Sequence, residues 1–207
     1  MRSDRFINLL VLAASFFLLS CSGAGSQVDN AAPRKIFASS QLNSSDLRTL
    51  GGGTTGIRGA DTICQQQANS NSVFRTVKAM IVDDIRRRAY STPGCAGGTA
   101  EQIDWVLKTN TVYMRPDGTV IGTTDAKGLF IFPLSNAIST TGGIMLTGFS
   151  SNADWTSDIN NNCSDWESSA GGSDAARGVL NSTTSSVLQS GVRACNLGQV
   201  QLYCVEQ

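Results

Sequence analysis

The stretch CNLGQVQLYCVEQ, residues 195–207, brings two cysteines close together at the end of the chain, with only three residues after the second. Such a pair, Cys195 and Cys204, is compatible with a metal site, a dithiol redox site or structural disulfides. The sequence has no His, and no two cysteines have the CxxC spacing that is usual in zinc and redox sites. The residues therefore favour structural disulfides, and we expect neither a metal nor a cofactor.

The composition indicates a single exported domain that is rich in loops. The chain has 207 residues, of which 41% are hydrophobic, so it is long enough to bury one sizeable core. Only 15% of the residues are charged, 21 are Gly, and Ser, Thr and Asn dominate the polar positions. This composition is typical of loop-rich secreted proteins, and long helices are not expected.

The N-terminus has the features of a bacterial lipoprotein signal peptide. A short basic segment, residues 1–5, precedes an apolar stretch, residues 6–20, that is too short to span a membrane comfortably as a permanent helix. The stretch leads into LLSC, residues 18–21, which resembles the lipobox that precedes a lipidated cysteine. An ordinary signal peptide is the alternative, but the small-x-small pattern of its cleavage site is missing. We therefore predict a signal peptide over residues 1–20 and lipidation of Cys21.

The residues after the signal peptide divide into a tether and a domain. Residues 21–34 are mostly small and polar and lack periodicity, so we expect a flexible tether there and a domain over residues 35–207. Removal of residues 1–20 takes away two of 16 basic and one of 16 acidic residues, which leaves a net charge of about −1. This charge gives no global attraction to nucleic acid or to anionic membranes. Membrane attachment is expected through the lipid.

Six segments of the domain have the patterns of regular elements. Strands are expected at KIFASSQL, VKAMIVDD, GLFIFPL and VQLYCV, and a hairpin is expected in TVYMRPDGTVIGTT around its Pro-Asp-Gly turn. A helix is expected in IRGADTICQQQAN, because Ile57, Ala60, Cys64 and Ala68 share one helical face. Residues 150–190 are rich in Ser, Asn, Asp and Gly, and we expect long loops there that are functional or cross-linked.

Apart from Cys21, five cysteines remain, and an odd number leaves one without a partner. Exported chains fold in an oxidising environment, so disulfides are the default, although the residues alone do not choose the connectivity. The order of Cys64, Cys163, Cys195 and Cys204 resembles the nested pattern of C-type-lectin-like and endostatin-like domains.

That resemblance implies pairing of Cys64 with Cys204 and of Cys163 with Cys195. It also implies an α+β fold with two helices, a curved antiparallel sheet and long loops held by the inner disulfide. Cys95, in the turn STPGCAGG, is then left over. We interpret it as a free or locally buried thiol in a flexible, exposed turn; an intermolecular bridge, or exchange with one of the paired cysteines, is the alternative.

A closer resemblance extends over most of the domain. The segments GIRGADTICQQQAN, IDWVLKTNTVYMRPDGTVIGTTDAKGLFIFPL, CSDW and LYCVEQ resemble the leptospiral endostatin-like lipoproteins, a spirochaete family with a domain of unknown function. Members are surface-exposed outer-membrane lipoproteins, and several bind host extracellular-matrix proteins, plasminogen or complement regulators. The resemblance implies an adhesin on the outer membrane with partners such as laminin, fibronectin, plasminogen or factor H.

The residue types give little support to an enzyme or a calcium site. Nucleophilic triads use His as the base, and the sequence has none. Five carboxylates of the polar region could supply a glycosidase pair, but a solvated acidic loop is the simpler interpretation. The loop that begins at Asp158 has Cys163 and Ser169 where a calcium-binding EF-hand has Gly and Glu. The carboxylates are Asp154, Asp158, Asp165, Glu167 and Asp174.

The basic run Arg86, Arg87 and Arg88 is the candidate ligand-binding feature, because guanidinium groups make bidentate contacts with sulfate and carboxylate. The alternative, which we favour, is that Asp83 and Asp84 neutralise it on a solvated surface. The three tryptophans could stack on sugars, although a core role is commoner. These are Trp105, Trp155 and Trp166.

The function that we expect is therefore a non-enzymatic binding module presented on a lipid anchor, as loops on rigid scaffolds commonly act in recognition. Two other functions remain open from the sequence. The first is a carbohydrate-binding lectin, and the second is an envelope protein with a structural role and no host ligand.

Overall fold

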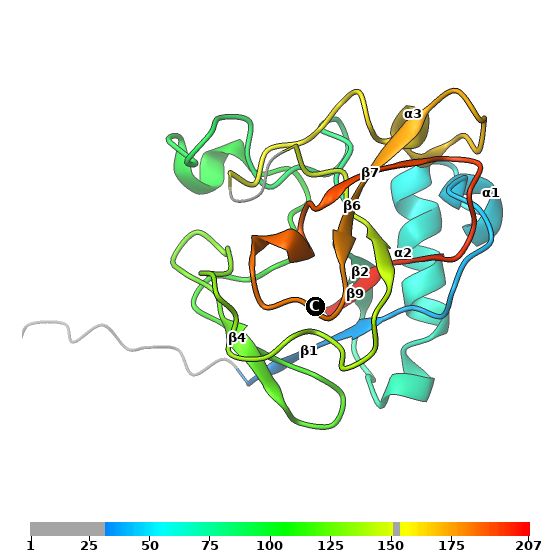
Figure 1. Ribbon diagram of the computed structural model, residues 1–207. Coiled ribbons are helices and arrows are strands. Elements are labelled where there is room, and N and C mark those ends of the chain that lie inside the picture. The colour runs from blue at the N-terminus through cyan, green and yellow to red at the C-terminus, as the bar shows by residue number, and fades with distance from the viewer. Residues whose placement is uncertain (1–31, 151–153) are drawn as a thin grey trace, which may run out of the picture.

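The last strand of the chain, β9 (Tyr203–Glu206), lies inside the larger of two sheets in the computed structural model, which describes residues 32–150 and 154–207 (Figure 1). It pairs in antiparallel fashion with β1 on one side and β2 on the other, and all four of its residues are buried. The predicted signal peptide, Cys21 and most of the predicted tether lie outside the described residues. The end of the sequence is therefore central to the domain.

Two mixed sheets carry the fold. The larger one has the spatial order β2 (Val77–Ala79), β9, β1 (Arg34–Ala38), β3 (Val112–Met114) and β4 (Val120–Thr123). The smaller one has the order β7 (Gly191–Ala194), β6 (Asp174–Val179), β5 (Ile144–Leu146) and β8 (Val200–Gln201). The pairs β1/β3 and β5/β8 are parallel. The expectation of one antiparallel sheet was therefore wrong, although the α+β class is confirmed.

The helices of the described residues are few and mostly short. They are α1 (Leu47–Gly51), α2 (Gly56–Gln66) and α3 (Cys163–Trp166), with 3-10 turns at η1 (Asn69–Asn71), η2 (Gly98–Glu101) and η3 (Ser185–Val187). The predicted helix is α2, and its predicted apolar face is buried, as Ile57, Ala60 and Cys64 show. Among these helices only α2 is long enough to cover a sheet, so the expected pair of helices is replaced by one longer helix and the two short helices α1 and α3.

Several strand predictions differ from the structure, including VQLYCV, which divides into β8 and β9 of different sheets. The strand expected in VKAMIVDD ends at Ala79, because the following residues leave the sheet for a tight turn around Asp83. GLFIFPL forms no strand; only Phe130 makes a bridge, and Pro133 has no N–H for a ladder. The long polar region contains β6, the longest strand in the described parts of the chain, which the small buried side chains of Ala175 and Ala176 allow. The hairpin of β3 and β4 is confirmed.

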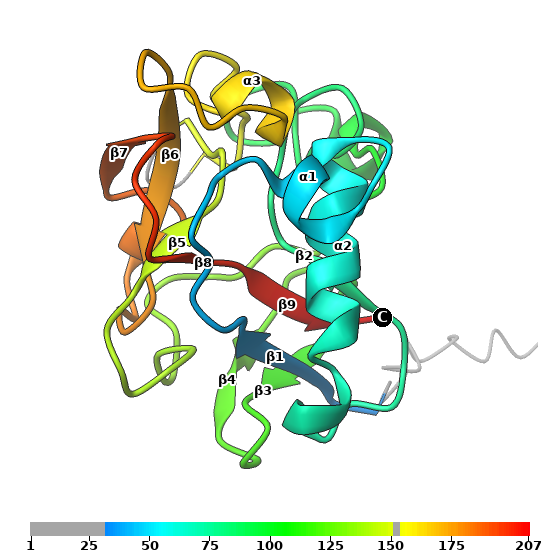
Figure 2. The same cartoon turned by 90° about the vertical axis from the view of Figure 1, so that its right-hand side faces the viewer.

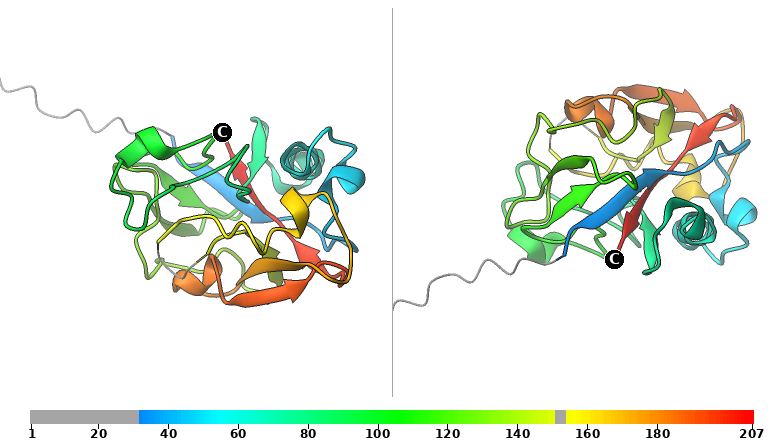
Figure 3. Two further views of the ribbon diagram at one scale, coloured as in Figure 1. Left: turned by 90° about the horizontal axis from the view of Figure 1, so that it is seen from above. Right: turned by 90° about the horizontal axis from the view of Figure 1, so that it is seen from below.

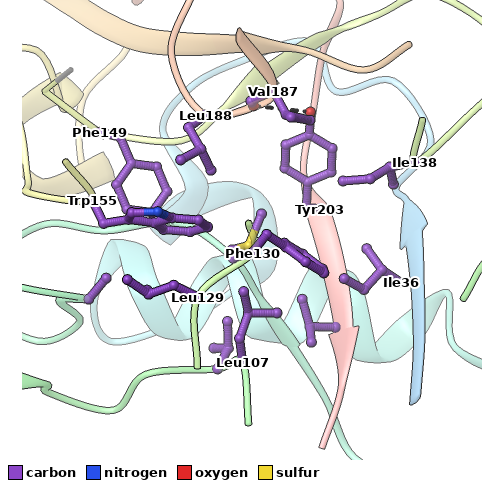
Figure 4. Packing of buried hydrophobic residues seen from close by; sticks show 14 of the residues in the cluster. Ile36, Leu107, Leu129, Phe130, Ile138, Phe149, Trp155, Val187, Leu188 and Tyr203 are labelled. Atoms are coloured by element: carbon purple, nitrogen blue, oxygen red, sulfur yellow. Dashed lines mark hydrogen bonds between the residues drawn. The ribbon is translucent and has the colours of Figure 1, made fainter. Parts of the chain in front are cut away.

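Side-chain alternation divides the interior into two apolar clusters. On β9, Tyr203 and Val205 belong to one cluster, whereas Cys204 belongs to the other, and Ile36 and Phe37 on β1 divide in the same way. Figure 4 shows the first cluster, in which Tyr203 lies near Ile138 and Val187. The second cluster lies beneath α2, which Figure 2 shows against β9 and β2. Figure 3 shows β1 and β9 side by side, with α2 seen end-on.

Within the described residues, two disulfides hold these layers together. Cys64 on α2 is bonded to Cys204 on β9, and Cys163 at the start of α3 is bonded to Cys195 just after β7. This is the pairing that the resemblance implies. The first bond joins the helix to the central strand across 140 residues, and the second holds α3 against the smaller sheet across 32 residues.

Candidate functional site

A charged cleft of about 800 Å³ opens beside the start of α2. One wall is the loop between α1 and α2, and the other is formed by β2 and two loops that pack next to it. Its lining includes Gly52–Thr55, Arg58, Asp61, Lys78, Arg86 and Asp104. The cleft therefore combines three cationic side chains with two carboxylates.

Capping residues and glycines determine the conformation of the loop between α1 and α2, which forms one wall of the cleft. Asp46 caps α1, because its carboxylate accepts a hydrogen bond from the N–H of Thr49 at 3.0 Å, and Thr55 caps α2 through its hydroxyl. Gly52 ends α1 with φ +65°, in the left-handed region that favours glycine. At Gly59 a Cβ would overlap the backbone of Leu47, so a glycine there lets α1 pack directly onto α2. The wall is therefore a rigid turn.

The floor of the cleft is organised by a fully buried arginine. Arg87 makes a bidentate ion pair with Asp61, at 2.7 and 2.8 Å, and a second ion pair with Asp104. It also donates to the carbonyl of Ala79 at 2.8 Å. Burial alone would lower the pKa of Arg87, but the hydrogen bonds and charges of the two carboxylates outweigh burial and raise it. Arg87 is thus a permanent cation that ties α2 to β2 and to the loop at Asp104.

The two carboxylates of the floor, Asp61 and Asp104, have further partners besides Arg87. Asp61 accepts a hydrogen bond from the N–H of Ala79 at 2.9 Å, and Asp104 also pairs with Lys78. Burial would raise the pKa of Asp104, but the hydrogen bonds from Arg87 and Lys78 outweigh it and keep this pKa below its ordinary value. The floor is therefore a fixed chain of alternating charges with no net charge.

The three consecutive arginines do not form the open basic patch considered from the sequence. Arg87 is inaccessible, so it is excluded as a ligand contact. Arg88 pairs with Asp84 at 3.5 Å, as the favoured alternative expected. Asp83, however, is buried, and its carboxylate accepts the N–H groups of Arg86 and Arg87. Neutralisation by the two aspartates is therefore present, but Asp83 acts from a buried position, whereas the Arg88–Asp84 pair is partly exposed.

Arg86 is the member of the run that reaches the cleft. Its guanidinium lies 3.3 Å from Asp83, 3.6 Å from Asp165 and 3.7 Å from Glu167. Glu167 also pairs with Arg48 on α1 at 2.7 Å. Two carboxylates of the predicted acidic loop therefore serve as ion-pair partners that hold α3 against the cleft.

Arg58 differs from the other cations of the cleft. It lies in the first turn of α2 and is exposed, and its guanidinium has no ion pair or hydrogen bond within residues 32–150 and 154–207. No acidic residue occupies that first turn. Among the described residues, Arg58 is therefore the cation in the cleft that is free to meet an anionic group on a ligand.

The cleft lies within a segment of the chain that matches a known protein family. Residues 48–185 match the family described as "Protein of unknown function (DUF1554)", and every residue that lines the cleft falls within the match. The chain belongs to this family. No curated protein matches the chain. In this DUF1554 chain the match also contains α2 and Cys163, whereas Cys195 and β9 follow it.

Other predicted site residues of the DUF1554 chain have structural roles. Trp105, Trp155 and Trp166 are buried, so the core role favoured from the sequence is confirmed for all three, and their rings are not available for sugar stacking. Trp105 packs edge-on against Trp155, and the indole N–H of Trp166 donates to the carbonyl of Val82 at 2.9 Å. Among the described ranges, no group of three or more His, Cys, Asp or Glu side chains gathers as a metal site, and no helix is long and apolar enough to cross a membrane.

Cys95 is free, and its turn is exposed as predicted, but its own side chain is buried beneath the turn. Glu101 organises this turn by accepting hydrogen bonds from Ser91, Thr92 and Gly97. The hydrogen bond from the Thr92 side chain contributes most to lowering the pKa of Glu101 to about 2. Burial raises the pKa of Cys95 to about 11, although Lys127 acts in the opposite direction.

We expect Cys95 to react slowly with thiol reagents in the folded protein. A pKa of about 11 leaves little thiolate at pH 8, so the labelling rate should be roughly a hundredfold or more below that of the urea-unfolded chain. The rate should still be rising at pH 10. Absorbance with a chromogenic disulfide reagent measures both states, with Cys95→Ser as the blank. Equal rates in the folded and unfolded chains would contradict this assignment.

Proposed function

We propose that this chain is a surface-exposed outer-membrane lipoprotein, anchored by lipid at Cys21, that acts as a non-enzymatic binding module for host proteins. The proposal follows the resemblance to the leptospiral endostatin-like lipoproteins and to C-type-lectin-like domains. Its partners are extracellular-matrix proteins, plasminogen or complement regulators. The observation that carries it is the charged cleft with Arg58 uncommitted at its wall.

The cleft suits recognition because its parts are already fixed. Its floor consists of ion pairs around Arg87, and its loop wall is capped at both ends, so few groups need to be ordered on binding. Arg58 supplies a planar guanidinium that makes bidentate contacts with a carboxylate or a sulfate. A protein partner with an acidic side chain matches this arrangement.

We expect Arg58→Glu to weaken binding to the partner by about tenfold or more, because a hydrogen bond to a charged group contributes about 1.5–3 kcal/mol and the new carboxylate repels the ligand. The measurement is a solid-phase panel of laminin, fibronectin, plasminogen, factor H and heparin, with the detergent-solubilised lipoprotein as analyte. A triple change of Arg86, Arg87 and Arg88 is unsuitable, since Arg87 is part of the buried framework.

The matched control is Arg177→Glu, which makes the same charge change on β6, in the smaller sheet and outside the cleft. It should leave binding within about twofold. If both variants bind as the unchanged protein does, the cleft is not the binding site. If the unchanged protein binds no member of the panel, the proposed class of partner is wrong.

A further inference from the structure

One end of the larger sheet collects positive charge. Because β9 runs antiparallel to β1 and β2, and β1 runs parallel to β3, the starts of β1, β2 and β3 and the end of β9 meet at the same end of the sheet. Figure 3 shows the start of β1 and the C-terminus close together in both views. We call this region the basic end; its residues are Arg34, Lys35, Phe74, Arg75 and Lys108.

Hydrogen bonds confirm that these segments adjoin. The amine of Lys35 donates to the carbonyl of Ser72 at 2.6 Å, which joins the start of β1 to the loop before β2. The N–H of Lys108 donates to the hydroxyl of Tyr113 at 2.8 Å, and Tyr113 is the register partner of Arg34 across β1 and β3. The basic end is therefore one surface contributed by three segments that are distant in sequence.

The positive charge there is only partly neutralised. Glu206 accepts the N–H of Lys35 at 2.8 Å and lies 3.7 Å from the guanidinium of Arg75. Within the described residues, neither Arg34 nor Lys108 has an ion pair. Lys108 is exposed, whereas Arg34 is half-buried, and its buried Nε and Nη1 atoms lack any hydrogen-bond partner. Burial lowers the pKa of Lys108, and the nearby charges of Arg34 and Lys78 lower it further. A local excess of cations thus exists although the formal net charge of the chain is zero.

Phe74 gives the basic end an apolar contact. Its side chain is 86% exposed, the largest value among the exposed large hydrophobic residues that the structure describes. It stands next to Arg75 and directly after the buried Val73, which holds the loop in place. Single exposed apolar residues are common, but an aromatic ring among cations is the combination found in proteins that lie on membrane surfaces.

We propose that the basic end rests on an anionic phospholipid surface, with Phe74 at the level of the headgroups and the cations against the phosphates. This inference rests on the proposed lipid anchor, because Cys21 precedes Arg34 by only a short stretch of chain. A membrane surface fits better than a soluble ligand because the charge is spread over the starts of three strands and no pocket is needed to receive it.

This orientation has a consequence for the charged cleft. α2 runs from the cleft, at Gly56, towards the basic end, at Gln66, and its 11 residues span about 16 Å. Figures 1 and 2 both show α3, which borders the cleft through Asp165, at the opposite end of the molecule from the start of β1. With the basic end on the membrane, the cleft points away from it, towards partners in solution.

The test uses Phe74→Trp in the full-length lipoprotein, inserted in vesicles of phosphatidylcholine with or without phosphatidylglycerol. The three native tryptophans are buried, so their emission should be the same in both kinds of vesicle, and a difference reports the surroundings of the new tryptophan. We expect its emission to shift to the blue, and brominated lipid to quench it, only when phosphatidylglycerol is present. Adding Arg75→Glu should weaken this contact about fivefold or more, and high salt should do the same.

The control is Ile159→Trp, another exposed position, shortly before α3. It should give the same emission in both kinds of vesicle. Vesicle flotation of the protein measures the lipid anchor separately, so a missing anchor and a missing surface contact give different results. Identical emission of the Phe74→Trp variant in both vesicles would overturn the proposal, as would a shift with heparin and none with phosphatidylglycerol.

Discussion

Replacing Arg87 by methionine is expected to lower the free energy of unfolding by about 3 kcal/mol. The change leaves Asp61 and Asp104 beside each other without their shared cation, and it leaves the carbonyl of Ala79 without a donor. Breaking a buried ion pair costs about 3–5 kcal/mol. We expect the lower end of this range because the side chain of Asp104 is 40% exposed and water screens part of its charge. Urea unfolding of the two proteins measures the difference.

The neighbouring Arg88→Met is the control, because Arg88 is partly exposed and its ion pair with Asp84 is long, at 3.5 Å. Its cost should be about 1 kcal/mol or less. The two variants should also differ in how their stability depends on pH. The pKa of Asp104 is lowered from 3.8, so its contribution to stability is present above that value and is lost as the pH falls below it. The Arg87→Met protein should lose the share of this acid dependence that comes from Arg87, while the share from Lys78 remains. Equal costs for the two variants would refute the assigned role.

The elements that could be predicted are those with a local pattern. The apolar face of α2 repeats at helical spacing, and the alternation in LYCVEQ assigns Tyr203 and Cys204 to opposite clusters. The turn of the β3/β4 hairpin is specified by Pro116 and Gly118. By contrast, the pairing of the cysteines came from a family resemblance, because a count of five cysteines is compatible with many connectivities.

The candidate site could not be predicted because its residues are joined only by the fold. Asp61 and Asp104 lie 26 and 17 residues from Arg87, and no motif links them. The run of three arginines drew attention as a surface feature, whereas in the fold one member is buried and one reaches the cleft. The same holds for the basic end, where strand order, rather than sequence distance, brings Arg34 near Lys108.

Removal of the Cys64–Cys204 disulfide is the change with the largest expected effect. The bond closes a loop across 140 residues, for which chain entropy predicts a loss of about 5 kcal/mol in the free energy of unfolding. The Cys163–Cys195 bond closes a loop across 32 residues, for which the same relation gives about 4 kcal/mol. The outer bond also fixes α2 to the central strand, so its loss exposes the second cluster to water. The total free energy of unfolding of a native protein is about 5–15 kcal/mol, so either loss is a large part of it.

The measurement is urea unfolding of Cys64→Ala/Cys204→Ala and of Cys163→Ala/Cys195→Ala, with Cys95→Ala as the control for a buried thiol that closes no loop. The urea midpoint should be highest for Cys95→Ala, lower for the variant without the Cys163–Cys195 bond, and lowest for the variant without the Cys64–Cys204 bond. In the outer pair, hydrogen exchange should rise first in α2 and β2, whereas in the inner pair it should rise in α3 and β7. If loss of the Cys163–Cys195 bond lowers the free energy of unfolding more than loss of the Cys64–Cys204 bond does, the loops around α3 contribute more to stability than the attachment of α2 to the last strand.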